Sequence, residues 1–432
     1  MNVRSLFQIL LILLAVPLFA AGQVPGAVEP TGELTIDSAI STALLLSPTL
    51  AAAASGVSAA DARLDQAGLY DNPEFDLEIE NFGGSGERSG FDAAETTFAL
   101  SQPLLLGGKI AARKGVAAAD LTLAARDVDA VRLDIVAVTT IAFNNVLVAQ
   151  ERVRLTEELA ELAKSFGDTV RSRVEAGKVS PVEEIRARAA VARAQVDVAK
   201  AKRVLAAARV GLASTWGSSD PQFSRVVGPL PRPTPPPPRA SLDEFLLQAP
   251  EMQRLTAEVN RQEQTIQLEK ALGTPDLKLT LGPRTYRETG GWAWVGGVSL
   301  PLPIFNRNQG ARRAAEFELE RTRHEVAARR VALESLLSQI LDRLRAVAEE
   351  AQSYEQEIIP ASTEAFEAMS IGFREGKFGF LEVLDAQRSL SEARLLHLDS
   401  LHRYAAASAE LERLLGRGFG TSLSKEKINE KE

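Results

Sequence analysis

The chain has 432 residues, of which 45% are hydrophobic and 25% charged, an ordinary composition for a folded protein of two or three domains. Its formal net charge of −8 argues against nucleic acid as a partner, and the lack of cysteine excludes disulfides and a lipidated N-terminal cysteine. Aromatic residues are scarce at 6% while alanine is abundant, which favours long helices packed through small side chains.

Residues 1–22 are expected to be a cleavable signal peptide. Arg4 supplies positive charge, residues 6–19 form an apolar run interrupted by Gln8 and Pro17, and residues 20–22 are small. A membrane anchor is the alternative, but the run is shorter than the roughly 20 residues that a spanning helix needs. The sequence therefore predicts an exported protein that is not a lipoprotein.

The remaining chain repeats itself with an offset of about 200 residues. Four pairs of Pro or Gly residues match at this offset: Pro73 and Pro275, Pro103 and Pro303, Gly177 and Gly376, and Gly217 and Gly416. We therefore predict a first structural repeat at residues 23–218 and a second at 241–417. A proline-rich linker at 219–240, expected to be extended polyproline, joins them, and a charged, disordered tail follows at 418–432.

The sequence predicts the same order of elements in both repeats: a helical stretch, a β-hairpin, a very long helix, a glycine break and another helix. The helical stretches are residues 36–67 and 241–272. Neither Gly nor Pro occurs at 116–166 or 311–359. At 1.5 Å per residue each of these runs would extend roughly 75 Å as a helix, which is too long for a compact globular fold.

Alternation of polar and apolar residues predicts two strands in each repeat, and so four in the chain. Phe75, Leu77 and Ile79 alternate with acidic residues, and Trp292 and Trp294 share one parity in the last strand. A transmembrane sheet must close on itself; four strands cannot close, but three chains would supply twelve. The alternative, which the pattern alone favours, is a soluble hairpin whose apolar face packs on the helices.

The whole order of elements, from about Leu34 to Gly416, resembles the TolC family of outer-membrane efflux proteins. Three segments are similar to outer-membrane components of cobalt-zinc-cadmium efflux systems, the CzcC type: NPEFDLEIENFGG, ETTFALSQPLLLGGKIAARKG and LPLPIFNRNQGARRA. One departure is LLLGGK, where an acidic residue is expected at the middle leucine. The resemblance therefore covers nearly all of the chain that follows the signal peptide.

The resemblance implies a mainly α fold with a transmembrane β contribution. In the outer membrane, a homotrimer would form a 12-stranded barrel with Trp292 and Trp294 at the membrane interface, and a periplasmic α-helical tube would narrow to a closable tip. It implies the exit duct of a tripartite efflux system for divalent cations such as Co, Zn and Cd, with a periplasmic adaptor and an inner-membrane RND-type pump as partners. Alternatives are a duct for drugs or type I secretion, and a non-membrane periplasmic coiled-coil scaffold.

The resemblance implies that the two glycine breaks are the helix-to-helix turns at this tip, and glycine suits such a sharp reversal because it tolerates positive φ. The resemblance implies that Gly177, Lys178, Gly376 and Lys377 contact the adaptor. The alternative is that the lysines are solvated residues that cap helices. Pro181 suits the first turn of the returning helix.

Three acidic residues near the turns are candidates for a pore gate. Glu382 and Asp385 are three positions apart and so share a helix face, and the repeat makes Glu183 the counterpart of Glu382. In a trimer they would form acidic rings, which attract cations and repel anions. The resemblance implies a gate at these positions; without it, an ordinary solvated face is the better interpretation.

No catalytic residue, cofactor or metal site is expected. The chain has three histidines and no cysteine. His397 and His402 are five positions apart, which does not align them on a helix, and His324 lies among arginines, so all three are interpreted as solvent-facing. A duct should hold its cargo weakly, because conduction needs reversible contacts.

Overall fold

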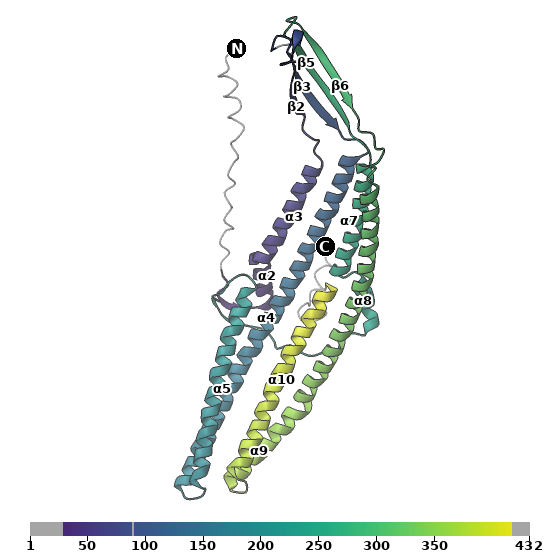
Figure 1. Ribbon diagram of the computed structural model, residues 1–432. Coiled ribbons are helices and arrows are strands. Elements are labelled where there is room, and N and C mark those ends of the chain that lie inside the picture. Colours follow the sequence, from purple (N-terminus) through teal and green to yellow (C-terminus); the bar gives the residue numbers. More distant parts are fainter. Residues whose placement is uncertain (1–28, 89, 417–432) are drawn as a thin grey trace, which may run out of the picture.

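The computed structural model describes residues 29–88 and 90–416, so the predicted signal peptide and charged tail lie outside the described residues. The molecule is long and mainly helical, with a small sheet at one end and two helical turns at the other (Figure 1). The first repeat contains β1 (Gly32–Leu34), α2 (Ile36–Leu46), α3 (Pro48–Ala67), β2 (Glu74–Glu80), η1 (Gly86–Arg88), β3 (Glu95–Leu104), α4 (Lys109–Glu175) and α5 (Pro181–Ser214).

The second repeat follows β4 (Phe223–Val226) and the short 3₁₀-helix η2 (Arg239–Ser241). It contains α6 (Asp243–Leu247), α7 (Pro250–Leu272), β5 (Leu277–Tyr286), β6 (Trp292–Ser299), α8 (Gln309–Ser353), the π-helix η3 (Tyr354–Ile358), α9 (Ile359–Glu375) and α10 (Phe380–Leu415). The two predicted hairpins are thus β2–β3 and β5–β6, and the two long helical paths are α4 and α8–α9.

Each predicted helical stretch consists of two helices, α2 and α3 in the first repeat and α6 and α7 in the second. Ser47 ends α2 and its side chain accepts a hydrogen bond at the start of α3, with Pro48 in the first turn. Pro250 likewise lies in the first turn of α7, after α6, but the residue before it, Ala249, provides no side-chain hydrogen bond. Proline fits the first turn of a helix but cannot continue one, so the chain bends there, by 44° between α2 and α3.

The prediction of very long helices is confirmed, but the helices extend beyond the glycine-free runs. α4 has 67 residues, or roughly 100 Å at 1.5 Å per residue, and passes through Gly115 and Gly167. At both positions a neighbouring helix comes close: a Cβ would lie 2.8 Å from Gln264 of α7 at Gly115 and 3.3 Å from Val191 of α5 at Gly167. Glycine here allows close packing and does not end the helix.

Two hydrophobic clusters lie near the middle of the molecule, one in each repeat. In the first, β1 and β4 form a parallel two-stranded sheet that the sequence did not predict, and Leu34 and Phe223 pack on Phe143 and Val146 of α4. The most apolar 18-residue stretch of α4 would be long and apolar enough to span a membrane by length and composition alone, but 39% of it is buried inside the chain. In the second cluster, α6 packs on α8 and α10.

The last helix of each repeat ends at a glycine that lies against a proline. Gly217 follows α5 and Gly416 follows α10, both with positive φ. A Cβ at Gly217 would lie 3.0 Å from Pro48, and one at Gly416 would lie 2.9 Å from Pro250. Each glycine therefore ends a helix and also leaves room for the proline that begins α3 or α7, so the duplication extends to single contacts.

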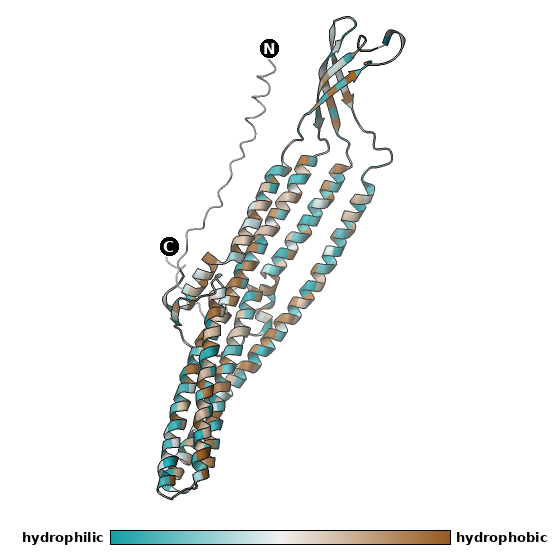
Figure 2. Cartoon of the chain, turned by 60° about the vertical axis from the view of Figure 1, so that its left-hand side comes forward, coloured by the Kyte–Doolittle hydropathy of each residue, from teal (hydrophilic) through white to brown (hydrophobic). Residues whose placement is uncertain are grey.

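The four-stranded sheet has the order β2-β3-β5-β6, with all pairs antiparallel, so β2 and β6 are its edges. It extends beyond the ends of the helices, and hydrophobic residues follow its strands (Figure 2). Phe75 is 68% exposed, Trp294 65% and Val298 71%. The interpretation of a soluble hairpin that packs its apolar face on the helices is therefore wrong.

Candidate functional site

The two turns at the tip have the same backbone structure. In the first, the Lys178 N–H donates to the carbonyl of Arg173 (2.8 Å), and Gly177 has φ +68°. In the second, the Lys377 N–H donates to the carbonyl of Gly372 (2.8 Å), and Gly376 has φ +80°. This hydrogen bond across six residues, with a left-handed glycine inside it, is the Schellman motif. The backbone of each lysine, not its side chain, thus satisfies the end of the helix.

Gly376→Ala is expected to destabilise the tip by about 1–2 kcal/mol, because an L-residue with a Cβ is strained at this positive φ. The matched control is Gly310→Ala in the first turn of α8, where a Cβ meets nothing within 4 Å and φ is not positive. Thermal unfolding in detergent should show a lower midpoint for the first variant only. Equal midpoints for both would mean that the turn tolerates alanine.

A hydrophobic cluster joins the two hairpins at the tip. It contains buried Val170, Ala187, Phe373, Phe380 and Val383, with half-buried neighbours that include Phe166 and Phe366. The rings of Phe166 and Phe366 are 5.9 Å apart in an edge-to-face arrangement, and those of Phe373 and Phe380 are 6.3 Å apart. Aromatic pairs at such distances attract each other in addition to the effect of burial. The cluster holds α4–α5 against α9–α10.

Arg173 adds a polar link between the hairpins. It lies in the last turn of α4, and its Nη1 donates to the carbonyl of Phe373 in α9 (2.5 Å). Its guanidinium also lies over the Phe373 ring, 4.7 Å from the centroid. A cation at the C-terminal end of a helix is favourable, and a cation over an aromatic face adds to that. Neither the contact of Arg173 nor the aromatic cluster was predicted from the sequence.

The three predicted gate carboxylates lie near the turns on two helices. Glu183 is on α5, with its side chain 24% exposed, and its nearest ion-pair partner is Arg186 at 4.0 Å. Glu382 and Asp385 are both exposed on α10. A Cβ at Gly379 would lie 2.7 Å from Oε2 of Glu382, so this carboxylate folds back over the start of its own helix. An acidic group is stabilised there by the helix dipole, which gives Glu382 a structural role as well.

The lysines at the turns differ in their surroundings. Lys377 forms an ion pair with Glu375 (2.6 Å), and both side chains are more than half exposed. Lys178 is exposed as well. Exposed ion pairs contribute little to stability, so these side chains are available for contact with another molecule.

The sheet at the opposite end has one apolar and one polar face. Cross-strand pairs on the apolar face include Phe75 with Leu100, and Pro283 with Trp294. The Trp292 and Trp294 rings are 6.0 Å apart and exposed. Residues of the polar face are Glu74, Asp76, Glu78 and Glu80 of β2, Glu95, Thr97 and Ser101 of β3, and Lys278, Thr280 and Arg284 of β5.

Charges on the polar face of the sheet are largely paired. Arg284 forms ion pairs with Glu80 (2.8 Å) and Glu95 (3.0 Å) and donates to the Thr97 hydroxyl (2.8 Å). Lys278 pairs with Glu74 at 2.7 Å. Such a sheet has one face suited to lipid and another suited to water.

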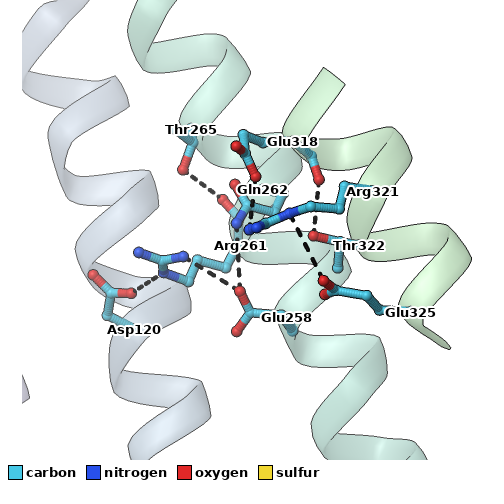
Figure 3. A network of polar contacts seen from close by, with 9 residues as sticks. All are labelled: Asp120, Glu258, Arg261, Gln262, Thr265, Glu318, Arg321, Thr322 and Glu325. Carbon is cyan, nitrogen blue, oxygen red and sulfur yellow. Dashed lines mark hydrogen bonds and ion pairs between the residues drawn. The ribbon is translucent and has the colours of Figure 1, made fainter. Parts of the chain in front are cut away.

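Ion pairs connect the helices between the sheet and the middle of the molecule. Arg261 of α7 donates to Asp120 of α4 (2.6 Å) and contacts Glu258 (3.3 Å), as Figure 3 shows. The hydrogen bond to Asp120 raises the pKa of Arg261. Two turns away, Arg254 of α7 donates to Asp127 (2.7 Å). α7 is therefore linked to α4 by two arginines on one helix face.

The interpretation of all three histidines as solvent-facing is wrong for two of them. His324 is 79% exposed, but Nε2 of His397 and Nδ1 of His402 are buried without a hydrogen-bond partner. Burial lowers the pKa of both. The packing of α10 between α4 and α8 covers them, which the spacing of residues along one helix could not reveal. In the described part of the chain, no group of three or more His, Cys, Asp or Glu residues could hold a metal ion.

A long helical hairpin joined to a β-hairpin occurs twice in the chain, and the two β-hairpins together form one open amphipathic sheet. The family model described as "Outer membrane efflux protein" matches residues 39–218 and again 241–417, so the chain belongs to the outer membrane efflux protein family. Its fold is that of the TolC-like channels, as the resemblance implied.

Among particular relatives, the chain is 35% identical over 390 residues to the cobalt-zinc-cadmium resistance protein CzcC of Cupriavidus metallidurans, covering 90% of this chain and 91% of that one. It is 26% identical to the nickel-cobalt-cadmium resistance protein NccC of Alcaligenes xylosoxydans xylosoxydans, over 70% and 67% of the two chains. The crystal structure of CusC is similar, with a TM-score of 0.72 and 19% identity over 89% of this chain and 92% of that one.

Proposed function

We propose that the protein is the outer-membrane exit duct of a tripartite efflux system and that three copies form it. The observation that carries this proposal is the four-stranded sheet, which has an exposed apolar face and two unpaired edges, β2 and β6. Unpaired backbone groups cannot remain in lipid, so the sheet must close. Three copies, each pairing β6 with β2 of the next, would close a 12-stranded barrel, and the helices would form a tube below it.

The two faces of the sheet support this arrangement. The apolar face would contact lipid, with Trp292 and Trp294 at the membrane interface, where such aromatic residues are enriched. The polar face, with Arg284 and the acidic residues of β2, would line the water-filled interior. Residues 1–22 would direct export and be removed, which leaves the barrel as the attachment to the outer membrane.

Divalent metal cations are the proposed cargo. The support is the likeness to CzcC along nine tenths of both chains, together with the likeness to NccC, since the names of both relatives refer to metal resistance. The described residues offer no group of side chains that could hold a metal ion tightly, which suits a conduit. An adaptor and an inner-membrane RND-type pump would supply the metal and the energy.

At the tip, we propose that Glu183, Glu382 and Asp385 form acidic rings around the pore and that the two turns meet the adaptor. The adaptor would contact Gly177 and Lys178 in one turn and Gly376 and Lys377 in the other. Two observations support these roles: the residues lie at or near the two helical turns, at the end of the molecule opposite the sheet, and the lysine side chains are exposed. Rings of carboxylates would attract cations and slow anions.

Two substitutions on β6 test the barrel. Val298→Arg places a charge on the apolar face and should cost about 2–4 kcal/mol near the middle of a bilayer. Val295→Arg, the matched control, places the same charge on the polar face. We expect the first variant to be nearly absent from outer-membrane fractions as a heat-resistant trimer and the second to be present. Equal amounts of both, or a soluble periplasmic pool of the unaltered protein, would overturn the duct and favour the coiled-coil scaffold.

A further inference from the structure

The second repeat contains a helical irregularity that the first lacks. The π-helix η3, Tyr354–Ile358, interrupts the path from α8 to α9, whereas α4 is α-helical throughout. Pro360 lies in the first turn of α9 and has no N–H, so the Gln356 carbonyl loses the partner it would have in an α-helix. A π-turn followed by proline is a common site of a helix kink and often marks a functional position.

Packing around η3 is uneven. Just before it, Ala351 is 1% exposed and packs with Leu398 and Leu401 of α10. Residues 352–371 contain no buried side chain within the chain, until Gly372 and Phe373 reach the tip cluster. The corresponding part of α4 buries Leu155, Thr156, Ala163 and Val170. α9 is thus packed less tightly than the corresponding part of α4, with only half-buried side chains such as Phe366 and Met369 between its two ends.

His397 faces this turn from α10. Its Nε2 is buried without a hydrogen-bond partner, and burial lowers its pKa more than the negative charge of Glu355, in η3, raises it. The next residue in α10, Leu398, belongs to an apolar cluster to which α4 contributes Val148 and Leu155. Along the helix face of His397, Arg394 is three residues away. Glu355 is therefore the carboxylate on which a protonated His397 would act.

His402, one and a half turns further along α10, has a different charge environment. Burial lowers its pKa most, Asp399 raises it, and Arg152 of α4 and Arg403 lower it. Asp399 is already paired with Arg403 at 3.2 Å, and Arg403 also pairs with Glu350 at 2.7 Å. His402 thus has arginines around it and no free carboxylate in that group, so it is the poorer proton acceptor.

We propose that η3 is the hinge of the second helical hairpin and that protonation of His397, through Glu355, sets its position. In the neutral form, Nε2 of the half-buried imidazole stays buried without a partner and the π-turn keeps its exposed position. In the charged form, Nε2 carries a proton and burying that N–H unpaired is unfavourable. The charged imidazole would draw Glu355 and the π-turn toward α10, which rotates α9 and shifts the tip. The step toward opening the duct rests on the proposed function, but the hinge itself does not.

The direction of the pH effect follows from the lowered pKa. The folded form of this segment favours neutral His397, so its stability is complete above the ordinary histidine pKa of about 6.5. That stability is lost as the pH falls through the lower pKa of the folded protein. Acid, and not alkali, should therefore change the hinge.

Amide hydrogen exchange of the full-length protein in detergent tests this proposal, with rates corrected for the intrinsic effect of pH. When the pH is lowered from about 7.5 to about 5.5, amide exchange in residues 354–371 should accelerate about tenfold, because stability is lost in acid. Exchange in residues 155–172 of α4 should stay constant. His397→Gln and Glu355→Gln should each abolish the change, and His324→Gln, at an exposed histidine, should keep it. An unchanged pH response in His397→Gln, or no response in the unaltered protein, would overturn the proton switch.

Deletion of Glu357 tests the hinge separately. A π-turn holds one residue more than the α-helix requires, so removing one residue should restore the α-helical hydrogen bonds except the one that Pro360 cannot donate. We expect the deletion to slow exchange across residues 354–359 about tenfold and to remove the pH response. Exchange as fast as in the unaltered protein would overturn the hinge. These readouts need neither metal nor pump, so a failure here is distinct from a failure of the β6 test.

Discussion

The preference of the reconstituted channel for cations over anions is expected to fall several-fold when the acidic charge at the tip is removed. The variant that does this combines Glu183→Gln, Glu382→Gln and Asp385→Asn. Each chain loses three carboxylates near the narrow end, and the field of a charged ring on an ion in a narrow pore is only weakly screened. Glutamine at position 382 can still approach the start of α10, so the helix end is preserved. Reversal potentials across planar bilayers in a salt gradient measure the preference.

The control for this variant removes charge elsewhere. Asp243→Asn with Glu244→Gln changes two carboxylates in the first turn of α6, which packs with α8 and α10 at the middle of the molecule. Its reversal potential should stay close to that of the unaltered protein. If the tip variant and the control gave the same reversal potential, the three tip residues would not line the constriction, and Glu382 would be a helix cap alone.

Phe373→Ala is expected to have the largest effect on the tip, a loss of about 3–5 kcal/mol. Phe373 is 1% exposed, its ring packs between Phe166 and Phe380, and Arg173 lies over it. Truncation therefore removes the centre of the cluster that joins the hairpins. Hydrogen exchange in residues 166–176 and 372–383 should accelerate strongly, and the closed conductance of the channel should rise.

Ile371→Ala is the control, because Ile371 lies two positions away in the same helix and is 49% exposed. It should change exchange little. Arg173→Met keeps the apolar stem but loses the hydrogen bond to the Phe373 carbonyl, and should give an intermediate effect. If Phe373→Ala left the exchange of α4 near Arg173 unchanged, the two hairpins would not be coupled through this cluster.

The repeat made much of the fold predictable from sequence. Proline fixes φ and glycine permits a positive φ, so Pro48 and Pro250, or Gly177 and Gly376, act alike in both copies. Strand parity was also readable, because side chains alternate strictly along a strand. The pairing of β1 with β4 was not predictable, because it joins residues 32–34 to residues 223–226 and neither segment has a distinctive pattern. The π-helix was not predictable either, because its residues are ordinary helix formers.

The candidate site was predictable only in part. The turns and their left-handed glycines followed from sequence, whereas Arg173 did not, because its partner is a backbone carbonyl 200 residues away. A signal for the aromatic cluster did exist, since Phe166 and Phe366 match at the repeat offset. The burial of His397 and His402 depends on the packing of three helices, so it could not be predicted from the sequence of α10 alone.

Growth of a strain that lacks the gene, with and without its restoration, on zinc, cobalt, cadmium, nickel and a panel of drugs shows whether the protein is a membrane duct for metal cations. We expect selective sensitivity to divalent metals, which restoration of the gene cures and the Val298→Arg variant does not. Sensitivity to drugs alone would contradict the metal cargo while leaving the duct. Full restoration by Val298→Arg would contradict the membrane barrel itself.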